Sequence, residues 1–587
     1  MTNSKLCFFI IGFCFVFTGF KLEAQAFSTS NYPLGYFRDP LDIPITLAGN
    51  FGELRPGHFH MGLDVKTMAR VNLQVHAAAD GYVARIKIEP AGFGRAIYIN
   101  HPNGFTTLYA HLNDFNPALE TYVKQQQYKQ QSWSVFLDVP ANLFPVKKGD
   151  FIAFSGTTGG SQAPHLHFEI RRTFDDVNCN PLLFGMPLLD NLKPVLSKLA
   201  MYDRTKSTYE QSPKLIPVKM SAGRYTTMPL IIQSMSPRVS FAIHAFDAHN
   251  GAANRLGIYE AWLYDNNQLI CGFKMERISY NDTRYVNAHI DYKTRAAGGL
   301  FLQHLAALPG YLNSIYTKGK GNGVIDISDN GIHSIKIVVK DAYGNTSELS
   351  TQVQFKGLIS SAPLSVLAGG PAIKPSQPAG KIFYPLMLDV YDGEDCEFYM
   401  GENCLYDSVH IAYTRGVSPG LAAVSAVHTI GSTYIPLQEA FVVRIKPTQT
   451  LTADKLKHVV MQRFAGSDND VERVAWQNGW ASAKFRDFGS FQLLLDEQPP
   501  VIVPIGISNG ANLSRASRIA FTVHDNLEAF NNFRAELDGK WLRFTNDKGR
   551  TFMYNFDEMC LPGQHTLTVS VEDEAGNSTT QTYNFRR

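Results

Sequence analysis

The sequence predicts a mainly β protein built from a string of separate β modules. Stretches with the helical period are rare, whereas short alternations of apolar and polar residues, bounded by Gly, Asn, Asp and Pro, recur along almost all of the 587 residues. Hydrophobic residues make up 44% and charged residues 18% of the chain, which suits several packed cores and not a disordered protein. At roughly 150 residues per domain, this length indicates about three to five domains.

The first 26 residues have the three parts of a secretion signal. Lys5 gives a positive start, Leu6 to Phe20 form an apolar stretch, and Ala24-Gln25-Ala26 fits an A-x-A cleavage site. The apolar stretch is shorter than the roughly 20 residues that span a bilayer, which favours a cleaved signal over an uncleaved anchor. No later stretch of the sequence is apolar enough to span. We therefore expect an exported protein, in the periplasm, the cell envelope or outside the cell, and not an integral membrane protein.

The first domain is predicted over residues 27–190 as an antiparallel sheet with a helical insertion. The insertion is expected from Asn116 to about Gln131, because Asn116 can cap a helix, Pro117 fits its first turn and the glutamine-rich body favours helix. An alternating run from Trp133 to Val139 predicts a strand after it. The other expected strands, separated by turns, are Val71 to Val75, Gly81 to Ile88, Ala96 to Asn100, Thr106 to His111, Asp150 to Ser155 and His165 to Arg171.

Three further β modules are predicted after residue 190. We expect immunoglobulin-like sandwiches over residues 191–360 and 501–587, with a β-rich module over residues 361–500 between them. Gln498-Pro499-Pro500 indicates one boundary, and the proline-rich stretch from Pro363 to Pro378 indicates the other.

A weak internal repeat links the first and last of these three modules. In each, a strand runs into the pattern D-x-x-G-N, at Asp341 to Asn345 and at Asp573 to Asn577. A Gly-Asn turn of this kind lets the chain reverse into the last strand of a sandwich. Another strand, Val239 to Phe246, is expected to end at Asp247.

The cysteine content argues against a disulfide scaffold, and the charge argues against a nucleic-acid-binding protein. Five cysteines follow the signal, an odd and low number that does not fit a disulfide scaffold. Cys396 and Cys404 flank a Gly-containing loop and are candidates for a pair in an oxidising compartment. The net charge of +2 and the lack of a basic run with interleaved aromatics argue against nucleic-acid binding. The sequence does not fix the oligomeric state.

Two short segments of the first domain bring together residues that bind metals. If residues 58–64 are extended, His60 and Asp64 point to the same side, and Gly62 between them leaves room for an ion. His58 would share that face, where an ordinary solvent-exposed histidine is favoured over a substrate contact.

The second segment is a strand that carries the pattern H-x-H. Its alternation puts His165, His167 and Glu169 on one face and apolar residues on the other. Glu169 is either a partner that orients a ligand or an edge-strand charge, and we keep it out of the predicted site.

Two His and one Asp form a ligand set suited to zinc. Catalytic zinc keeps three protein ligands and one position for water, whose pKa it lowers to about 7. Each motif alone is more often incidental, but both occur beside Gly-rich turns of one β domain. The helical metalloprotease pattern H-E-x-x-H and the serine hydrolase pattern G-x-S-x-G are absent from the sequence.

The residues of the first domain resemble the lysostaphin and LytM type of zinc metallopeptidase, a family that cuts peptide crosslinks in bacterial cell walls. The resemblance covers most of the first domain, about a quarter of the chain. In chain order, the matching segments are H-x-x-x-D at His60 and Asp64, a Y-x-H-L-like segment at Tyr109 to Leu112, a Gly-rich run at Gly156 to Gly160 with Pro164 after it, and H-x-H at His165 and His167.

The resemblance implies a role for each of the five chemical residues. His60, Asp64 and His167 would bind Zn²⁺. His111 and His165 would be the unligated pair that orients the attacking water, takes its proton and steadies the oxyanion, since imidazole can serve as base and then as acid near neutral pH.

Two features depart from the family pattern. The helical insertion is longer than compact members require, and we expect it to reshape one wall of the cleft. Some members use a tyrosine to hold the oxyanion, which has no match here; the polar residue nearest the first ligand motif is Arg55.

The expected function is zinc-dependent hydrolysis of peptide crosslinks in peptidoglycan. One alternative is a non-catalytic module of the same type that regulates other wall hydrolases. Another is a surface-binding protein in which the β modules do the binding. The presence of all three ligands and both auxiliary histidines favours the enzyme.

Overall fold

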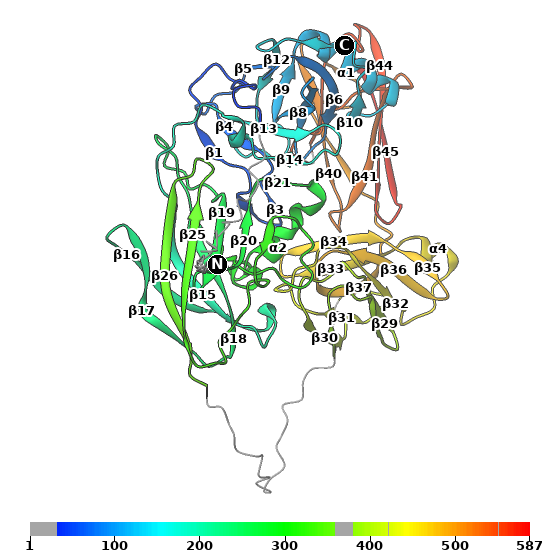
Figure 1. Cartoon of the computed structure of the whole chain (residues 1–587). Helices are drawn as coiled ribbons and strands as arrows, with labels where there is room; N and C mark the ends of the chain where they lie inside the picture. Colours follow the sequence, from blue (N-terminus) through cyan, green and yellow to red (C-terminus); the bar gives the residue numbers. More distant parts are fainter. Residues whose placement is uncertain (1–31, 358–379, 419, 421, 550) are drawn as a thin grey trace, which may run out of the picture.

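The computed structural model describes residues 32–357, 380–418, 420, 422–549 and 551–587. In these residues the chain forms 45 strands and four α-helices, which confirms the mainly β prediction. Figure 1 shows the first domain, in blue to cyan, beside the last module, in orange to red; the second module, in green, and the third, in yellow, lie below them. The predicted signal peptide and the boundary from Pro363 to Pro378 lie outside the described residues. The other domain limits stay predictions.

The first domain is built on one antiparallel sheet with the strand order β1-β4-β13-β8-β7-β6-β10. β11 adds to it beside β6, and β14 adds beside β13. The bounds are β1 Leu47–Gly49, β4 Leu63–Lys66, β6 Gly81–Ile88, β7 Arg95–Asn100, β8 Phe105–Ala110, β10 Val135–Asp138, β11 Pro145–Val146, β13 His165–Arg172 and β14 Asn178–Cys179.

Two smaller sheets complete this domain. The strands β5, β12 and β9 form one, and the hairpin β2-β3 forms the other. Their bounds, with the short 3-10 helix η1 that follows β14, are β2 Leu54–Arg55, β3 His58–Phe59, β5 Gln74–His76, β9 Leu112–Phe115, β12 Phe151–Ser155 and η1 Pro181–Phe184.

Strands that alternate clearly in the sequence form close to their expected positions. In β13, Leu166, Phe168 and Ile170 are fully buried in the core of the first domain, as the alternation predicts. The strand expected from Val71 is shorter and begins only at Gln74. The reason is a turn in the preceding segment, where Asn72 has a positive φ of 63°.

The helical insertion forms as expected. α1 spans Pro117–Gln130, and the Asn116 side chain caps it by accepting a hydrogen bond from the backbone N–H of Leu119. Leu119 and Val123 bury the inner face in the core. On the outer face, Lys124 pairs with Asp557 at 2.7 Å. The insertion therefore supports the last module, and the hydrogen bonds and ion pairs of α1 do not reach the predicted site residues.

The second module continues the sheet of the first domain. Its strand β21 pairs with β14, so one ladder crosses from one module to the next. Phe51, Phe59 and Met61 of the first domain are buried in the apolar cluster of the second. The first two modules therefore share a core as well as a sheet.

One large sheet, in the order β22-β18-β15-β16-β17-β26-β25-β19-β20-β23, forms the second module, with β24 beside β18. Its strands are β15 Val195–Asp203, β16 Lys214–Ser221, β17 Arg224–Ser234, β18 Arg238–Phe246, β19 Glu260–Asp265, β20 Gln268–Lys274, β21 Arg277–Ile278, β22 Gln303–His304, β23 Tyr316–Lys318, β24 Ile325–Asp326, β25 Ile332–Lys340 and β26 Thr346–Phe355. Its helices are η2 Thr208–Glu210, η3 Tyr280–Tyr285, α2 Val286–His289 and α3 Tyr292–Ala296.

The third module has two sheets, β27-β30-β31-β37-β33-β34 and β28-β29-β32-β36-β35. Its elements are β27 Gly380–Phe383, β28 Asp389–Asp392, β29 Cys396–Met400, β30 Val409–Gly416, β31 Val427–Ile430, β32 Phe441–Ile445, α4 Ala453–Lys457, β33 Val459–Ala465, β34 Asp468–Arg473, β35 Ala475–Gln477, β36 Trp480–Phe485 and β37 Gly489–Leu495. Cys396 and Cys404 are buried free thiols here, so the candidate disulfide between them does not form.

The last module also has two sheets, β38-β40-β43 and β39-β45-β44-β41-β42. Its strands are β38 Val501–Ile505, β39 Ala511–Asn512, β40 Arg518–His524, β41 Phe530–Leu537, β42 Lys540–Trp541, β43 Thr551–Asn555, β44 Gln564–Asp573 and β45 Ser578–Arg586. Both D-x-x-G-N segments are turns of hairpins, joining β25 to β26 and β44 to β45, as predicted. Within the described ranges, no helix has the length and apolar character to cross a membrane.

Candidate metal centre

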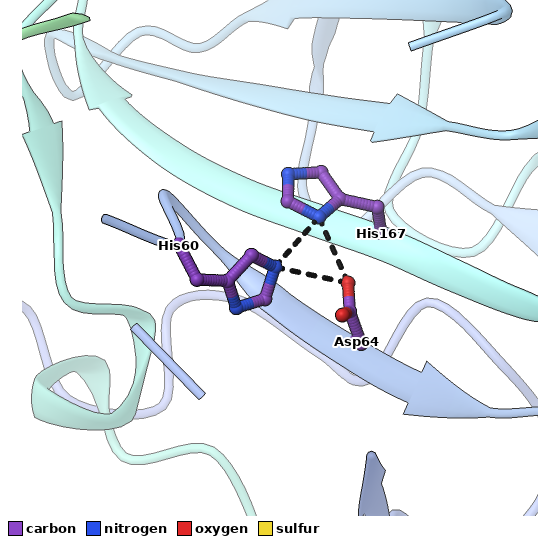
Figure 2. A group of neighbouring side chains, drawn as sticks. All are labelled: His60, Asp64 and His167. Carbon is purple, nitrogen blue, oxygen red and sulfur yellow. Dashed lines mark hydrogen bonds and ion pairs between the residues drawn. The ribbon is translucent and has the colours of Figure 1, made fainter. Parts of the chain in front are cut away.

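Three side chains of the first domain converge beside the central strand β13. The pairing of β4 with β13 places Asp64 directly opposite His167, and His60 lies in the short connection before β4. Asp64 Oδ1 lies 3.0 Å from His60 Nε2 and 2.9 Å from His167 Nδ1. The two ring nitrogens are 3.0 Å apart. Figure 2 shows all three side chains pointing at one another.

The hydrogen bonds on the far side of each imidazole fix the facing atoms as acceptors. His60 Nδ1 donates to the carbonyl oxygen of Asn50 at 2.8 Å, and His167 Nε2 donates to Glu169 Oε1 at 2.8 Å. The lone pairs of His60 Nε2, His167 Nδ1 and Asp64 Oδ1 therefore meet in one buried spot. Acceptors this close need a cation or a proton between them. Two nitrogens and one carboxylate oxygen are a donor set that fits zinc.

Gly62 was expected to leave room for an ion, but the structure shows that glycine is required here by close backbone packing. A Cβ at this position would lie 2.4 Å from the carbonyl oxygen of Phe168. Glycine thus allows the chain before β4 to pass against β13. The segment is also not one continuous strand, because β3 ends at Phe59 and β4 begins at Leu63. Phe59 and Met61 anchor the connection in the core of the second module.

Glu169 is a fully buried part of this centre, which the sequence reasoning left out. Its Oε1 accepts the hydrogen bond from His167, and its Oε2 accepts hydrogen bonds from Arg171 Nε at 2.6 Å and Asn178 Nδ2 at 2.8 Å. A carboxylate behind a histidine fixes the tautomer of the ring and raises its basicity. In the sequence, the alternation H-x-H-x-E-x-R of this strand was the signal that places Glu169 and Arg171 on the same face as His167.

A residue of the second module completes the shell around Glu169. Tyr280, at the start of η3, donates its hydroxyl to Glu169 Oε1 at 2.6 Å, and its ring lies 5.9 Å from that of Phe93. Phe93 in turn lies 5.7 Å from the His167 ring. No spacing in the sequence could have revealed Tyr280, because it follows Glu169 by 111 residues.

The carboxylates beside His167 raise the pKa of its imidazole ring. Burial alone would lower the pKa of His167, but the hydrogen bonds to Asp64 and Glu169 outweigh it and raise the pKa to about 9. Burial opposes ionisation of Glu169 as well, yet Arg171 and His167 hold its pKa at about 2. Burial lowers the pKa of His60 to about 4, so that ring is neutral at pH 7. The carboxylates of Asp64 and Glu169 thus favour positive charge at His167.

His111 and His165 lie beside the three converging residues. Their rings are 4.8 Å apart, and the His111 ring is 5.8 Å from that of His167. Each donates its Nδ1 hydrogen to a backbone carbonyl, His111 to Thr158 at 2.9 Å and His165 to Ala163 at 2.8 Å. In the neutral form of each ring, Nε2 therefore carries no hydrogen, and His165 Nε2 lies 3.4 Å from Asp64 Oδ1.

The backbone at His111 is held in an uncommon conformation. Its φ is +60°, which a residue other than glycine rarely adopts. Burial lowers the pKa of His111 to about 3, with a contribution from the neighbouring His167 and His165. The ring is thus neutral at pH 7.

The contacts of Arg55 and His58 define the environment of these two residues near the first ligand motif. The Arg55 guanidinium pairs with Asp64 Oδ2, the carboxylate oxygen that faces away from the histidines. Arg55 therefore orients Asp64 and is not free to hold an oxyanion. His58 is exposed and its Nδ1 contacts the carbonyl of Pro56, which agrees with the solvent-exposed interpretation.

The last module contacts the loop that carries the partners of His111 and His165. Asp547 Oδ1 accepts a hydrogen bond from the backbone N–H of Gly159 at 2.8 Å, and Lys548 Nζ donates to the carbonyl of Ser161 at 2.5 Å. Gly159 has a φ of +65°, and a Cβ there would lie 2.2 Å from the backbone of Gly94. The Gly-rich run is therefore needed for close packing of two loops beside the histidines.

Comparison with known proteins agrees with this geometry. Residues 58–128 match the profile of peptidase family M23, and residues 382–496 match that of a Zu5-like domain. The chain is similar to the DD-carboxypeptidase/endopeptidase Mpg of Neisseria meningitidis serogroup B, with 30% identity over 29% of this chain and 30% of that protein. It is also similar to an uncharacterized metalloprotease of Haemophilus influenzae, with 32% identity over 26% of this chain and 28% of that protein.

Among solved structures, the chain is similar to the catalytic domain of lysostaphin from Staphylococcus simulans. The identity is 25%, the match covers 23% of this chain and 87% of that domain, and the TM-score is 0.17. The chain matches less than a third of the length of the curated relatives. The family match over residues 58–128 includes His60, Asp64 and His111. The chain therefore carries a domain of peptidase family M23, the lysostaphin and LytM type.

Proposed function

We propose that this protein is a zinc-dependent endopeptidase that hydrolyses peptide crosslinks of bacterial peptidoglycan. The observation that carries the proposal is the convergence of three buried acceptor atoms beside two histidines that each present an unprotonated Nε2. The match to peptidase family M23 supports it, as does the name of the endopeptidase relative. Peptidoglycan lies outside the cytoplasm, so export through the predicted signal peptide is part of the proposal.

His60 Nε2, Asp64 Oδ1 and His167 Nδ1 are the atoms that would hold zinc. Bound there, zinc would polarise the scissile carbonyl and lower the pKa of a water molecule to about 7. Asn50 and Glu169 hold the two rings in the tautomers that this binding needs, and Arg55 holds the second oxygen of Asp64. Three protein ligands leave a position for water, which is the arrangement of catalytic and not of structural zinc sites.

His111 and His165 would handle the proton. Because each Nδ1 is fixed to a backbone carbonyl, each Nε2 can only accept a hydrogen bond or a proton. The lowered pKa of His111 keeps its ring neutral at pH 7, so that its Nε2 can accept a hydrogen bond from a water molecule and orient it. A proton taken by one imidazole can then be passed to the leaving amine.

The alternative of a non-catalytic regulator makes a different demand on the site. A module that only binds a partner does not need both auxiliary histidines aligned by backbone carbonyls. Their alignment here favours the enzyme over that alternative.

The test is hydrolysis of purified peptidoglycan by the mature protein. We expect release of peptides that stops on addition of EDTA and in the His167→Ala variant, while the His524→Ala variant, in which an exposed histidine of the last module is removed, remains active. Hydrolysis by the His167→Ala protein would contradict the zinc assignment. Mass spectrometry of the same products identifies the bond that is cut.

A further inference from the structure

Two clusters of carboxylates lie outside the histidine centre, one at the second module and one at the last. In each cluster, three aspartates offer oxygens that lie within 4.8 Å of one another. The first cluster is Asp190, Asp247 and Asp341, and the second is Asp496, Asp525 and Asp573.

The two clusters occupy equivalent positions in the two modules. Each begins with an aspartate four residues before a proline that precedes the first strand, at Asp190 before β15 and at Asp496 before β38. Each continues with the residue directly after an inner strand, Asp247 after β18 and Asp525 after β40. Each ends with the aspartate that opens the D-x-x-G-N turn. The internal repeat of the sequence is therefore a repeat of one three-carboxylate arrangement.

The asparagine of each D-x-x-G-N turn ties the cluster together in the same way. Asn345 Nδ2 donates to Asp341 Oδ2 at 2.7 Å and to the carbonyl of Asp190 at 3.4 Å. Asn577 Nδ2 donates to Asp573 Oδ2 at 2.9 Å and to the carbonyl of Asp496 at 3.0 Å. The turn asparagine therefore fixes the linker aspartate to the end of the sandwich in both modules.

The carboxylates lack positive partners. Within the described residues, no Lys, Arg or His forms an ion pair with any of the six aspartates. His249, close to the first cluster, accepts a hydrogen bond from the backbone N–H of Leu47 through Nε2 and contacts the carbonyl of Asn250 through Nδ1, so neither of its ring nitrogens bonds to a cluster carboxylate. The negative charge of each cluster is thus uncompensated by the described protein.

Buried oxygens without hydrogen-bond donors provide a second and independent sign of a ligand. Asp247 and Asp496 are each only 4% exposed, yet Asp247 Oδ1 and Asp496 Oδ2 have no partner in the described part of the chain, and the same holds for Asp525 Oδ1. A buried carboxylate oxygen without a partner is costly and rare. Burial, together with Asp341 and Asp190, raises the pKa of Asp247 to about 8. Ionisation of this carboxyl is therefore unfavourable unless a cation lies beside it.

We propose that each cluster binds one calcium ion. Three carboxylates and no nitrogen or sulfur form a hard, all-oxygen set, which favours Ca²⁺ over zinc. Calcium–oxygen distances of about 2.3–2.6 Å put the ligands of one ion at most about 5 Å apart, which agrees with the spacing here. Calcium also accepts irregular geometry, whereas magnesium demands a near-ideal octahedron and keeps several waters.

The position of the clusters gives the proposed ions a structural task. Asp190 belongs to the segment that leaves the first domain, and Asp496 to the segment that leaves the third module. An ion held by one linker aspartate and two sandwich aspartates would fix each sandwich to the module before it. Calcium would therefore set the angle between modules, without contact with the peptide substrate.

The experiment is calorimetric titration of the zinc-loaded mature chain with Ca²⁺ alone. We expect two ions per chain, with a Kd of about 0.1–1 mM, as in extracellular modules. The Asp247→Asn and Asp525→Asn variants should each bind one ion, and the double variant none. The matched control is Asp454→Asn, an exposed aspartate of the third module, which should bind two. Asp190→Asn removes a ligand that is partly exposed and replaces Asp247→Asn if that variant fails to fold.

The measured stoichiometry decides between the proposal and its rejection. Stoichiometry of two that falls to one in each single variant supports the proposal, and so does a calcium-dependent rise in melting temperature that the double variant lacks. Fewer than one ion bound at about 10 mM Ca²⁺, or stoichiometry that the variants do not change, would overturn it. Equal affinity for Mg²⁺ would overturn the choice of calcium.

Discussion

The two sides of the histidine centre depend on different parts of the chain. On one side, His60 and His167 are buried, and the second module supports them through Tyr280 and through the packing of Phe59 and Met61. On the other side, His111 and His165 bind backbone carbonyls of the loop that contacts the last module. We therefore expect the second module to support the proposed zinc ligands and the last module to support the two histidines that are proposed to carry protons.

Removal of the second module, together with the third and the last modules that follow it, should have the largest effect. A chain that ends at residue 189 exposes Phe51, Phe59 and Met61, and each such buried side chain is worth about 1.5–3 kcal/mol. The total, about 5–9 kcal/mol, approaches the whole stability of a domain. We expect this fragment to lose its cooperative thermal transition in circular dichroism.

The matched control for that truncation is a chain that ends at residue 496. It lacks only the last module and should keep both the transition and the ability to bind zinc. Equal damage by the two truncations would contradict the division between the two sides.

Glu169→Gln should produce the next largest effect. The substitution removes the charge that fixes His167 and leaves the buried Arg171 with only the more distant Asp176, at 4.0 Å, as a counter-charge. We expect zinc affinity, measured by competition with a chromogenic chelator, to fall about 10–100-fold. The control is Glu558→Gln, which alters an exposed carboxylate on the surface, and unchanged affinity in the Glu169 variant would show that the residue is not a positioning group.

Tyr280→Phe should weaken the same side to a smaller degree. It removes one hydroxyl donor to Glu169, and a hydrogen bond to a charged group is worth about 1.5–3 kcal/mol when buried. Tyr280 is 37% exposed, so water replaces part of that loss. We expect a fall of less than about tenfold in zinc affinity, with no change in Tyr434→Phe. A loss as large as that of Glu169→Gln would mean that the hydroxyl is the main support of Glu169, whereas unchanged affinity would mean that only the ring, which Phe keeps, supports the centre.

Asp547→Ala tests the other side and should have the smallest effect. It removes one part-buried hydrogen bond, from Gly159 to the exposed Asp547 side chain, and a contact of an exposed charge contributes about 0.2–1 kcal/mol, or up to about fivefold in a rate. We expect kcat on a peptidoglycan peptide to change within that range while zinc affinity stays constant, as it should in Asp454→Ala. A fall in zinc affinity would show that the last module also supports the ligands.

Much of the fold could be predicted because its signals are local. The alternation of β13, the cap at Asn116 and the D-x-x-G-N turns each depend on residues that are neighbours in the sequence. The five chemical residues were found because their motifs lie within short segments, and the structure brings all five together.

The remainder could not be predicted because it depends on contacts between distant residues. Tyr280 reaches Glu169 from another module, and the left-handed backbone at His111 leaves no mark in its residue type. Gly62 was correctly singled out but for the wrong reason, since its close neighbour is a carbonyl of a strand more than 100 residues away. The clusters of three aspartates escaped notice because each draws on three segments that are spread over a whole module.

The contact between Gly159 and Asp547 joins residues that are 388 positions apart. A chain that is synthesised from its N-terminus exposes the loop beside His111 and His165 long before its partner in the last module is made. The histidine centre therefore gains this neighbour only after residue 547 has been added to the chain. The site is therefore complete only after the last module has been made, which is later than the synthesis of the peptidase domain itself.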